Sequence, residues 1–297
     1  MQLFFIRLIG ALLGLLPYGA LLRLGSGLGW LLGRVIRHRR SFVMETLARC
    51  LPERSAAERA QIADGMYRHL ATLALECLYF SGRRVEEFSR YVDIVGAENV
   101  AAIRAQGTGA LALMGHIGNW ELMGLAAASL WQPVSVVVKP IRNQAINSFW
   151  RGSRERMGLR LLPRDDAMRD CLKALKRKEA VALILDQNMR RHRGIFVNFF
   201  GTPACTTPGL AFLSAASQTA VIPIFMIRKP NGRHELHIRP HIPPPPNRDE
   251  ASIRDATQHY TLTLENIIRE YPDQWTWLHK RWRTQPESAA QTETERK

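Results

Sequence analysis

The sequence predicts an α/β fold with a mostly parallel central sheet flanked by helices, preceded by an N-terminal hydrophobic helical segment that anchors the chain to a membrane. Three observations lead to this prediction. Short apolar runs alternate with segments long enough for helices, as in βαβ units. The 297 residues are 46% hydrophobic, which is enough for a folded core. Long uncharged apolar stretches lie within the first 40 residues.

The N-terminal segment has the composition of a membrane element. LIGALLGLLPYGALL at 8–22 carries no charge, and after Arg23 a second apolar stretch, LGSGLGWLLG at 24–33, leads to the basic RHRR at 37–40. The apolar material continues past the length of a cleaved signal peptide. Because Pro17 interrupts the first run, a tilted span, a re-entrant hairpin and an in-plane anchor all stay open. The basic cluster predicts that RHRR lies on the cytoplasmic face.

Three glycines in this segment recur at a fixed interval. Gly25, Gly29 and Gly33 are four residues apart, which places them on one face of a helix. Such a face lets another helix approach closely, whereas a flexible loop is the alternative interpretation.

The body of the chain alternates helical and strand patterns. Residues 56–79 form an amphipathic helix, because apolar side chains recur every three or four positions. The predicted strands that follow are 110–114, 134–138, 159–162, 181–185 and 221–227. A tight turn at Lys229–Arg233 leads into the alternating HELHIRP, which predicts an added antiparallel strand. A final helix is expected at 251–271. The predicted organisation is an anchor at 1–40, an α/β domain at 41–285 and a polar tail at 286–297.

The balance of charges narrows the class of ligand. Forty-one Lys and Arg against 26 Asp and Glu give a net charge of +15, which attracts nucleic acid, acidic headgroups, phosphorylated substrates or an acidic carrier protein. The four cysteines, Cys50, Cys77, Cys171 and Cys205, are scattered without zinc-ligand spacing, so we expect no metal site and a reducing compartment. Cys205 has no sequence-level partner and is expected to be a buried thiol rather than a nucleophile.

The motif MGHIGNWELMG carries the candidate chemistry. His116 follows an apolar strand, and ligands of open α/β sheets gather at the carboxyl ends of strands. Gly115 and Gly118 permit a sharp turn and Asn119 is a candidate N-cap, so Glu121 falls in the first turn of the next helix.

His116 and Glu121 can cooperate only across such a break. On one continuous helix their side chains would point about 140° apart, given roughly 100° per residue. Across a loop-to-helix junction the carboxylate of Glu121 can fix the tautomer of His116, and the other ring nitrogen can then take a proton from a hydroxyl. A histidine that only caps a helix or binds a backbone carbonyl is the alternative.

Five blocks carry a resemblance over most of the chain. They are LARCLPE at 47–53, HIGNWE at 116–121, PRDDAMRDCLKALKRKEAVALILDQN at 163–188, VNFFGTPACTTPG at 197–209 and QWTWLHKRW at 274–282. Together they resemble the bacterial lipid A biosynthesis acyltransferases, the lauroyl and myristoyl transferase branch of the glycerolipid and lysophospholipid acyltransferase superfamily. The first block of that superfamily is H-x4-D/E after a strand.

The resemblance implies transfer of a fatty acyl chain from an acyl carrier protein thioester to a hydroxyl of a lipid A precursor, at the cytoplasmic face of the bacterial inner membrane. The implied partners are acyl carrier protein, the anionic glycolipid acceptor and the membrane, with no nucleic acid. The resemblance implies no metal and no cofactor beyond the carrier's phosphopantetheine arm. Acyl-chain length, the acylated position, coenzyme A as an alternative donor and oligomeric state are left open.

The resemblance also assigns roles to residues. His116 matches the general base and Glu121 its orienting carboxylate. Arg164, Asp186, Gln187 and Asn119 are the expected substrate-binding residues, with Arg164 suited to phosphate by its fork of donors. Asp186 also ends an apolar strand, where a charge can orient a base or a cation.

Two regions have competing interpretations. Phe199 and Phe200 either line the acyl chain or pack in the core. The tryptophans of QWTWLHKRWR suit a membrane interface or packing under the sheet. For the whole protein, an acyltransferase that uses another glycolipid or a lysophospholipid, and a membrane-tethered basic binding protein, are the alternatives to lipid A acylation.

Overall fold

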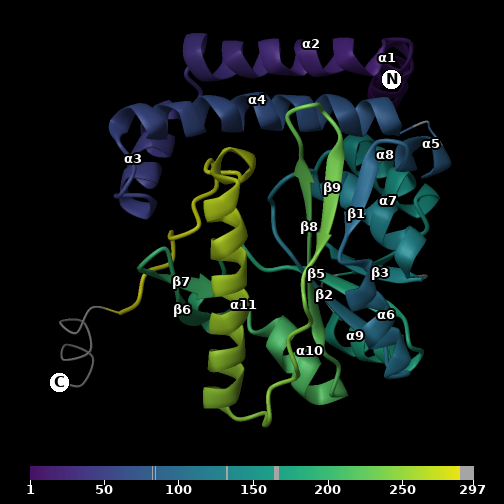
Figure 1. Ribbon diagram of the computed structural model, residues 1–297, viewed down its shortest axis with the longest axis vertical. Coiled ribbons are helices and arrows are strands. Elements are labelled where there is room, and N and C mark those ends of the chain that lie inside the picture. Colours follow the sequence, from purple (N-terminus) through teal and green to yellow (C-terminus); the bar gives the residue numbers. More distant parts are fainter. Residues whose placement is uncertain (82, 84, 132, 164–166, 288–297) are drawn as a thin grey trace.

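Figure 1 shows the computed structural model, which describes residues 1–287 apart from 82, 84, 132 and 164–166. Seven strands of this part of the chain form one sheet in the order β1-β9-β8-β2-β5-β3-β4, and β6 and β7 form a separate antiparallel pair. The five strands from β8 to β4 are parallel, β9 is antiparallel to β8, and β1 is parallel to β9. The prediction of a mostly parallel sheet flanked by helices is confirmed.

The elements have the following bounds. The strands are β1 (Val92–Val95), β2 (Ala110–Met114), β3 (Val134–Val138), β4 (Leu159–Pro163), β5 (Ala180–Ile184), β6 (Ile195–Phe199), β7 (Thr202–Thr206), β8 (Val221–Arg228) and β9 (His234–Ile238). The α-helices are α1 (Gln2–Gly14), α2 (Tyr18–Trp30), α3 (Arg40–Cys50), α4 (Ala56–Phe80), α5 (Val85–Ser89), α6 (Ala97–Ala105), α7 (Trp120–Leu130), α8 (Gln144–Arg156), α9 (Ala167–Lys176), α10 (Gly209–Ser217) and α11 (Glu250–Glu270). A π-helical turn η1 (Leu31–Val35) and the 3₁₀ turns η2 (Arg191–Arg193) and η3 (Pro272–Gln274) complete the set.

Most of the predicted elements lie where the patterns place them. The predicted strands and the helices at 56–79 and 251–271 begin and end within one residue of their predicted positions. Strand β9 is antiparallel to β8 across the predicted turn, in which Lys229 and Arg233 are hydrogen-bonded. Strand β1 and the β6-β7 hairpin were not predicted. The burial of β1 does not alternate, so its sequence lacks the two-residue period of a half-buried strand.

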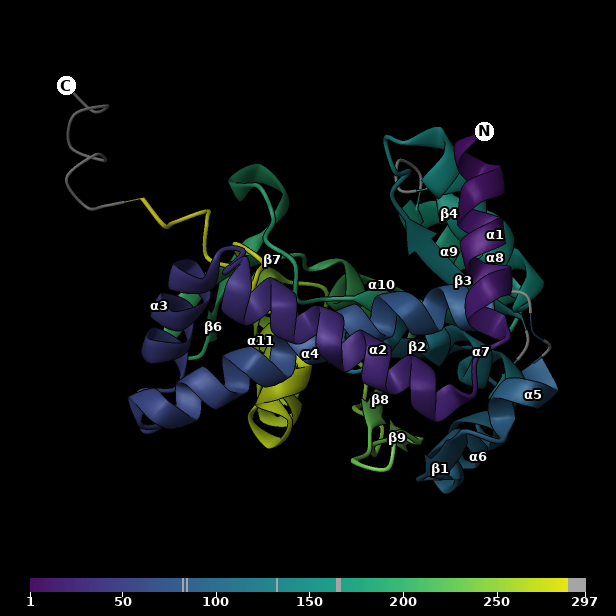
Figure 2. The same ribbon diagram turned by 90° about the horizontal axis from the view of Figure 1, so that it is seen from above.

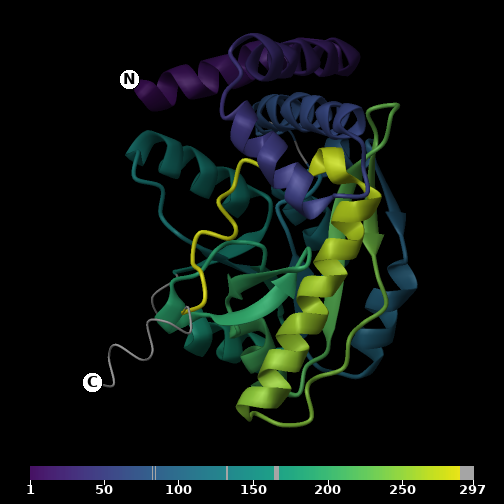
Figure 3. The ribbon, with the colours of Figure 1, turned by 90° about the vertical axis from the view of Figure 1, so that its left-hand side faces the viewer.

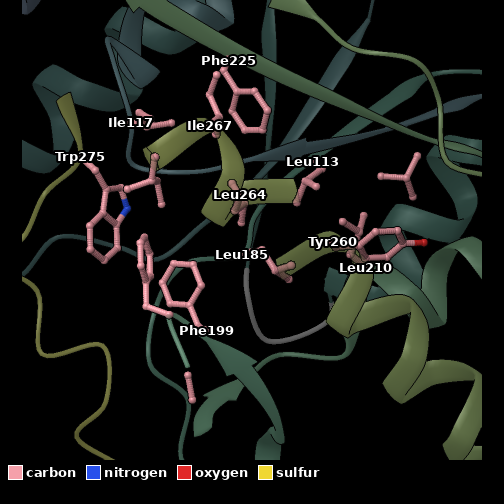
Figure 4. Packing of buried hydrophobic residues seen from close by; sticks show 14 of the residues in the cluster. Leu113, Ile117, Leu185, Phe199, Leu210, Phe225, Tyr260, Leu264, Ile267 and Trp275 are labelled. Carbon is pink, nitrogen blue, oxygen red and sulfur yellow. The ribbon is translucent and has the colours of Figure 1, made fainter. Parts of the chain in front are cut away.

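The two faces of the sheet carry different side chains. In β2, Leu111 and Leu113 join the core that includes α9, α10 and α11, whereas Ala112 and Met114 join the core that includes α6 and α7. Figure 3 shows α11 running along the sheet below the layer of α1, α2 and α4. Figure 4 shows Leu264 and other α11 side chains packed with Leu113 and its neighbours from the sheet. The alternation follows from the two-residue period of a strand.

The buried aromatic residues settle two open interpretations. Phe199 and Phe200 are 1% and 4% exposed, and Trp275 and Trp277 are 1% and 0% exposed. These four rings contact one another in a single cluster, which Trp282 joins through its stacking on Phe199. Core packing is therefore correct for the phenylalanines, and the tryptophans do not form a membrane interface.

The glycine repeat of the N-terminal segment is a packing face. Figures 1 and 2 show α2 lying on α4 as the outer layer of the molecule. A Cβ added at Gly29 would lie 2.3 Å from Arg68 Cα, and one added at Gly25 would lie 2.6 Å from Thr72 Cα. At Gly33 the obstacle is the ring of Tyr67, at 2.6 Å. The loop interpretation is therefore wrong, and the glycines set how closely α2 approaches α4.

The outer surface of these helices is apolar. Large exposed hydrophobic side chains gather on α1, α2 and η1, namely Phe4, Phe5, Leu8, Ile9, Leu12, Leu24, Leu28, Trp30, Leu31, Leu32 and Val35. Leu15 and Ile36 lie directly after α1 and η1 and are exposed as well. Within the described residues, no helix combines the length and the apolar composition that crossing a membrane requires.

Replacing Gly29 by alanine should destabilise the protein by about 1–3 kcal/mol, because the new methyl group collides with the backbone of α4. Gly27→Ala is the matched control, since a Cβ there meets nothing within 4 Å and alanine favours the helix by about 0.8–1 kcal/mol. Urea unfolding of both variants measures the difference. Equal stability of the two variants would show that the glycine face does not determine the packing.

Candidate active site

The parallel register of the sheet brings His116 and Asp186 together. Met114 of β2 pairs with Ile184 of β5, so the residues two positions beyond each strand meet at the same edge. Oδ1 of Asp186 lies 2.8 Å from Nδ1 of His116, and Oδ2 accepts the backbone N–H of His116 at 2.7 Å. The indole Nε1 of Trp275 donates to the same Oδ2 at 2.8 Å. Three hydrogen bonds thus fix the carboxylate against the imidazole.

The pair has complementary pKa shifts. Burial raises the pKa of Asp186, but the charge of His116 and the hydrogen bonds from His116 and Trp275 outweigh burial and bring it to about 2. Burial lowers the pKa of His116, but the charge and the hydrogen bond of Asp186 outweigh it and raise that pKa above 6.5. An ionised Asp186 therefore favours the tautomer with hydrogen on Nδ1, which leaves Nε2 able to take a proton.

The imidazole opens into a pocket of about 300 Å³. Its lining residues are His116, Trp120, Asp186, Gln187, Trp275, Thr276, Leu278 and His279. Nε2 of Gln187 lies 3.3 Å from Nε2 of His116, and the ring of Trp120 stands nearly edge-on to the imidazole. Of the expected substrate-binding residues, Gln187 thus lies at the site, beside the free nitrogen.

The carboxylate that contacts His116 is that of Asp186 and not that of Glu121, which corrects the predicted pairing. Glu121 lies in the first turn of α7, as expected, but its carboxylate binds Arg154 of α8 through contacts of 2.8, 3.0 and 3.2 Å. The pKa of His116 is raised mainly by Asp186, and the charge of Glu121 makes a smaller contribution. The orienting carboxylate is Asp186, because the register of β2 and β5 places it on Nδ1.

The turn after His116 is built as predicted. Gly118 has φ +59°, and a Cβ there would lie 1.6 Å from the carbonyl oxygen of Met226. Asn119 is the N-cap of α7, with its side-chain oxygen accepting the N–H of Leu122 at 3.0 Å. The side chain of Asn119 is fully buried and its amide group also binds Glu76, so its predicted role in substrate binding stays a prediction.

Two other predictions concern Arg164 and the cysteines. Arg164 lies outside the described residues. All four cysteines are free and buried, and burial raises the pKa of the Cys205 thiol, so Cys205 is not an activated nucleophile. Among the residues that the structure describes, no group of three or more His, Cys, Asp or Glu side chains could hold a metal ion.

Comparison with known proteins decides the family. A family model described as bacterial lipid A biosynthesis acyltransferase matches residues 2–284. The chain belongs to this family. It is similar to the lipid A biosynthesis lauroyltransferase of Escherichia coli, with 30% identity over 92% of this chain and 88% of the relative. The palmitoleoyltransferase and the myristoyltransferase of lipid A biosynthesis from the same organism are 28% and 26% identical, over 91% and 86% of this chain and 87% and 79% of theirs.

In this lipid A acyltransferase family member, sequence reasoning missed two residues of the site. Trp275 binds Asp186, and His279 lines the pocket. Burial lowers the pKa of His279, so its ring is neutral at neutral pH. Both belong to the QWTWLHKRW block, whose mixture of tryptophan and basic residues suits a membrane interface or packing under the sheet and gives no sign of a pocket. The position of Asp186 at the end of a strand was visible in the sequence, but its partner depends on β2 and β5 being neighbours, and no sequence signal points to Trp275.

A second cavity lies on the α7 face of the sheet. It has a volume of about 40 Å³ and an entirely apolar lining, which includes Ala110, Ala112 and Met114 of β2 together with Met123 of α7. Its lining offers a water molecule no hydrogen-bond partner, so the cavity is expected to be dry. Met114 ends the strand that leads to His116, so the cavity and the pocket lie along the same strand.

Replacing Asp186 by asparagine should bring the pKa of His116 below its value in the parent protein, because the opposing charge is lost while the burial that lowers this pKa is retained. A ¹⁵N NMR titration of the imidazole measures the pKa. Glu121→Gln is the comparison variant and should lower the pKa less. A larger effect of Glu121→Gln than of Asp186→Asn would restore Glu121 as the orienting carboxylate.

Proposed function

We propose that the protein transfers a fatty acyl chain from an acyl carrier protein thioester to a hydroxyl of a lipid A precursor. The single observation that carries this proposal is the His116–Asp186 pair at the edge of a pocket in a chain of the lipid A acyltransferase family. Relatives named as lauroyl, palmitoleoyl and myristoyl transferases of lipid A biosynthesis support the acceptor. The net charge of +15 suits an acidic carrier and an anionic acceptor.

The proposed mechanism uses His116 as general base. Nε2 takes the proton from the acceptor hydroxyl, which replaces the long contact with Gln187. The oxygen attacks the thioester carbonyl, the new ester C–O bond forms and the C–S bond breaks. The imidazolium, stabilised by Asp186, then returns the proton to the departing thiolate, so an ester and a free carrier thiol are the products.

His116→Gln should lower the transferase rate by at least about 10²-fold, because general-base catalysis contributes about 10²- to 10⁴-fold. The assay combines purified protein, acyl-carrier protein and a tetraacylated lipid A precursor, and mass spectrometry of the product counts acyl groups. His259→Gln, on the exposed face of α11, is the control and should keep full activity. In the unsubstituted protein kcat/KM should rise with pH through a pKa above 6.5, since the base must be neutral.

Three results would contradict parts of the proposal. A folded, fully active His116→Gln variant would remove the assigned base. Acylation of a lysophospholipid or another glycolipid in place of the lipid A precursor would keep the mechanism and replace the acceptor. Equal use of acyl coenzyme A would show that the carrier protein is not required.

The N-terminal helices support a location at the cytoplasmic face of the inner membrane. Their outward side chains are apolar, and a patch of this size on a soluble monomer marks an interaction surface. Exposed basic residues such as Arg7, Arg23 and Arg37 stand among them and suit anionic headgroups. We propose that α1 and α2 lie in the plane of the membrane surface, with α4 beneath them carrying the catalytic domain.

Phe4→Glu combined with Leu15→Glu should weaken binding to vesicles of anionic phospholipid by at least about tenfold, since each side chain loses its burial in the apolar boundary. Cosedimentation with the vesicles measures the binding. Leu262→Glu changes an exposed leucine on α11, away from the N-terminal helices, and should bind normally. Undiminished binding of the double variant would place the membrane contact elsewhere.

A further inference from the structure

A buried charge cluster lies under the loop formed by residues 116–119. Its centre is Glu76 of α4, whose side chain is 0% exposed. Arg228, at the end of β8, donates to Oε2 of Glu76 at 2.6 Å and also binds Oε1. The hydroxyl of Tyr18, at the start of α2, donates to Oε1 at 2.5 Å, and Nε2 of His234 lies 3.2 Å away. Four elements of the fold thus meet at one carboxylate.

The same carboxylate holds the turn that follows His116. Nδ2 of Asn119 donates to Oε2 of Glu76 at 2.6 Å. Nearby on α4, Nε2 of His69 lies 3.1 Å from the carbonyl oxygen of Gly118. The loop has backbone bonds as well, from Asn119 to Met226 at 2.9 Å and from Gly118 to η3. Helix α4 therefore contributes two side chains to the loop that carries His116.

Glu76 decides which way the amide of Asn119 faces. Burial raises the pKa of Glu76, but the charges of Arg228 and His234 outweigh burial and hold that pKa far below its usual range. An ionised carboxylate can only accept hydrogen bonds. The amide of Asn119 must therefore turn its NH₂ group to Glu76 and its oxygen to the N–H of Leu122. The second of these hydrogen bonds is the one that caps the N-terminus of α7.

We propose that Glu76 is a positioning residue for His116, which it fixes through the amide of Asn119, and that Tyr18 ties the N-terminal helix layer to this arrangement. The proposal rests on the proposed role of His116 as general base. With the amide held, the turn presents the backbone N–H of His116 to Asp186 at 2.7 Å and the ring to the same carboxylate. Without the hydrogen bond from Asn119 to Glu76, we expect both the N-cap of α7 and the turn at 116–119 to become less well fixed.

The proposal can be tested by exchanging the carboxylate of Glu76 and the amide of Asn119. Asn119→Asp alone keeps a good N-cap but sets two carboxylates against each other, and Glu76→Gln alone removes the acceptor-only partner. The double variant Glu76→Gln/Asn119→Asp restores one donor and one acceptor across the same contact and keeps one negative charge beside Arg228. We expect each single variant to lower kcat by about tenfold or more with little change in KM, and the double variant to recover most of the loss.

The pKa of His116 supplies a readout that a merely structural role would not move. A ¹⁵N NMR titration, with the signal assigned from a His116→Gln sample, should show a lowered pKa in each single variant and its recovery in the double variant. The titration needs no substrate, so it stays informative if the protein acts on another acceptor. Folded single variants with a kcat within twofold of the parent and an unchanged pKa would overturn the proposal, as would a double variant no better than the singles.

Tyr18→Phe covers the case in which the Glu76 and Asn119 variants do not fold. It removes one hydroxyl from the cluster and keeps the ring packed against Tyr91. Tyr91→Phe is the matched control, since it removes a hydroxyl from the neighbouring ring and not from the cluster. We expect a lower kcat and a lower His116 pKa in Tyr18→Phe and neither change in Tyr91→Phe. Identical behaviour of the two variants would overturn the link to the N-terminal helices.

Discussion

Strands β2 and β5 are hydrogen-bonded neighbours, and their register decides which carboxylate meets His116. Because Met114 lies opposite Ile184, Asp186 reaches both the ring and the backbone N–H of the histidine. The remaining parts of the site follow from this contact. Trp275 packs where it can donate to Asp186, and the turn at Gly118 is tight enough to leave the imidazole at the edge of the sheet. Because Asp186 occupies Nδ1 of His116, Glu121 forms its ion pair with Arg154 instead.

The periodic patterns predicted the fold well because each depends on local chemistry. Apolar runs, turn residues and helical spacing gave the strands and long helices, and Gly118 and Asn119 gave the break after His116. Which strands are neighbours is not a local property. Strand β5 follows β3 and β4 in the chain but lies between β2 and β3 in the sheet. The sequence motif therefore suggested Glu121, five residues from His116, whereas the carboxylate that contacts the histidine is Asp186, seventy residues away.

Two of the buried carboxylates, those of Asp186 and Glu76, each join elements that are distant in sequence. Removing a carboxylate from water is costly and is offset only when good partners satisfy it. Asp186 has an imidazole, an indole and a backbone N–H, and Glu76 has a guanidinium, a hydroxyl and an amide. Such groups stabilise little in net terms, but they allow few alternative arrangements of the surrounding loops. Both lie next to the segment 116–119, where the geometry of a proton transfer would be most sensitive to displacement.

The alternation of side chains along β2 places the core that supports Asp186 on one face of the strand and the apolar cavity on the other. Leu111 and Leu113 belong to the core that continues into α11 and the tryptophan cluster, whereas Ala110 and Ala112 line the apolar cavity on the opposite face. A substitution at an alanine can therefore reshape the cavity without touching the side on which Trp275 supports Asp186. The volume of the apolar cavity and the hydrogen bonds of Asp186 can therefore change independently of each other in evolution, because they depend on opposite faces of one strand.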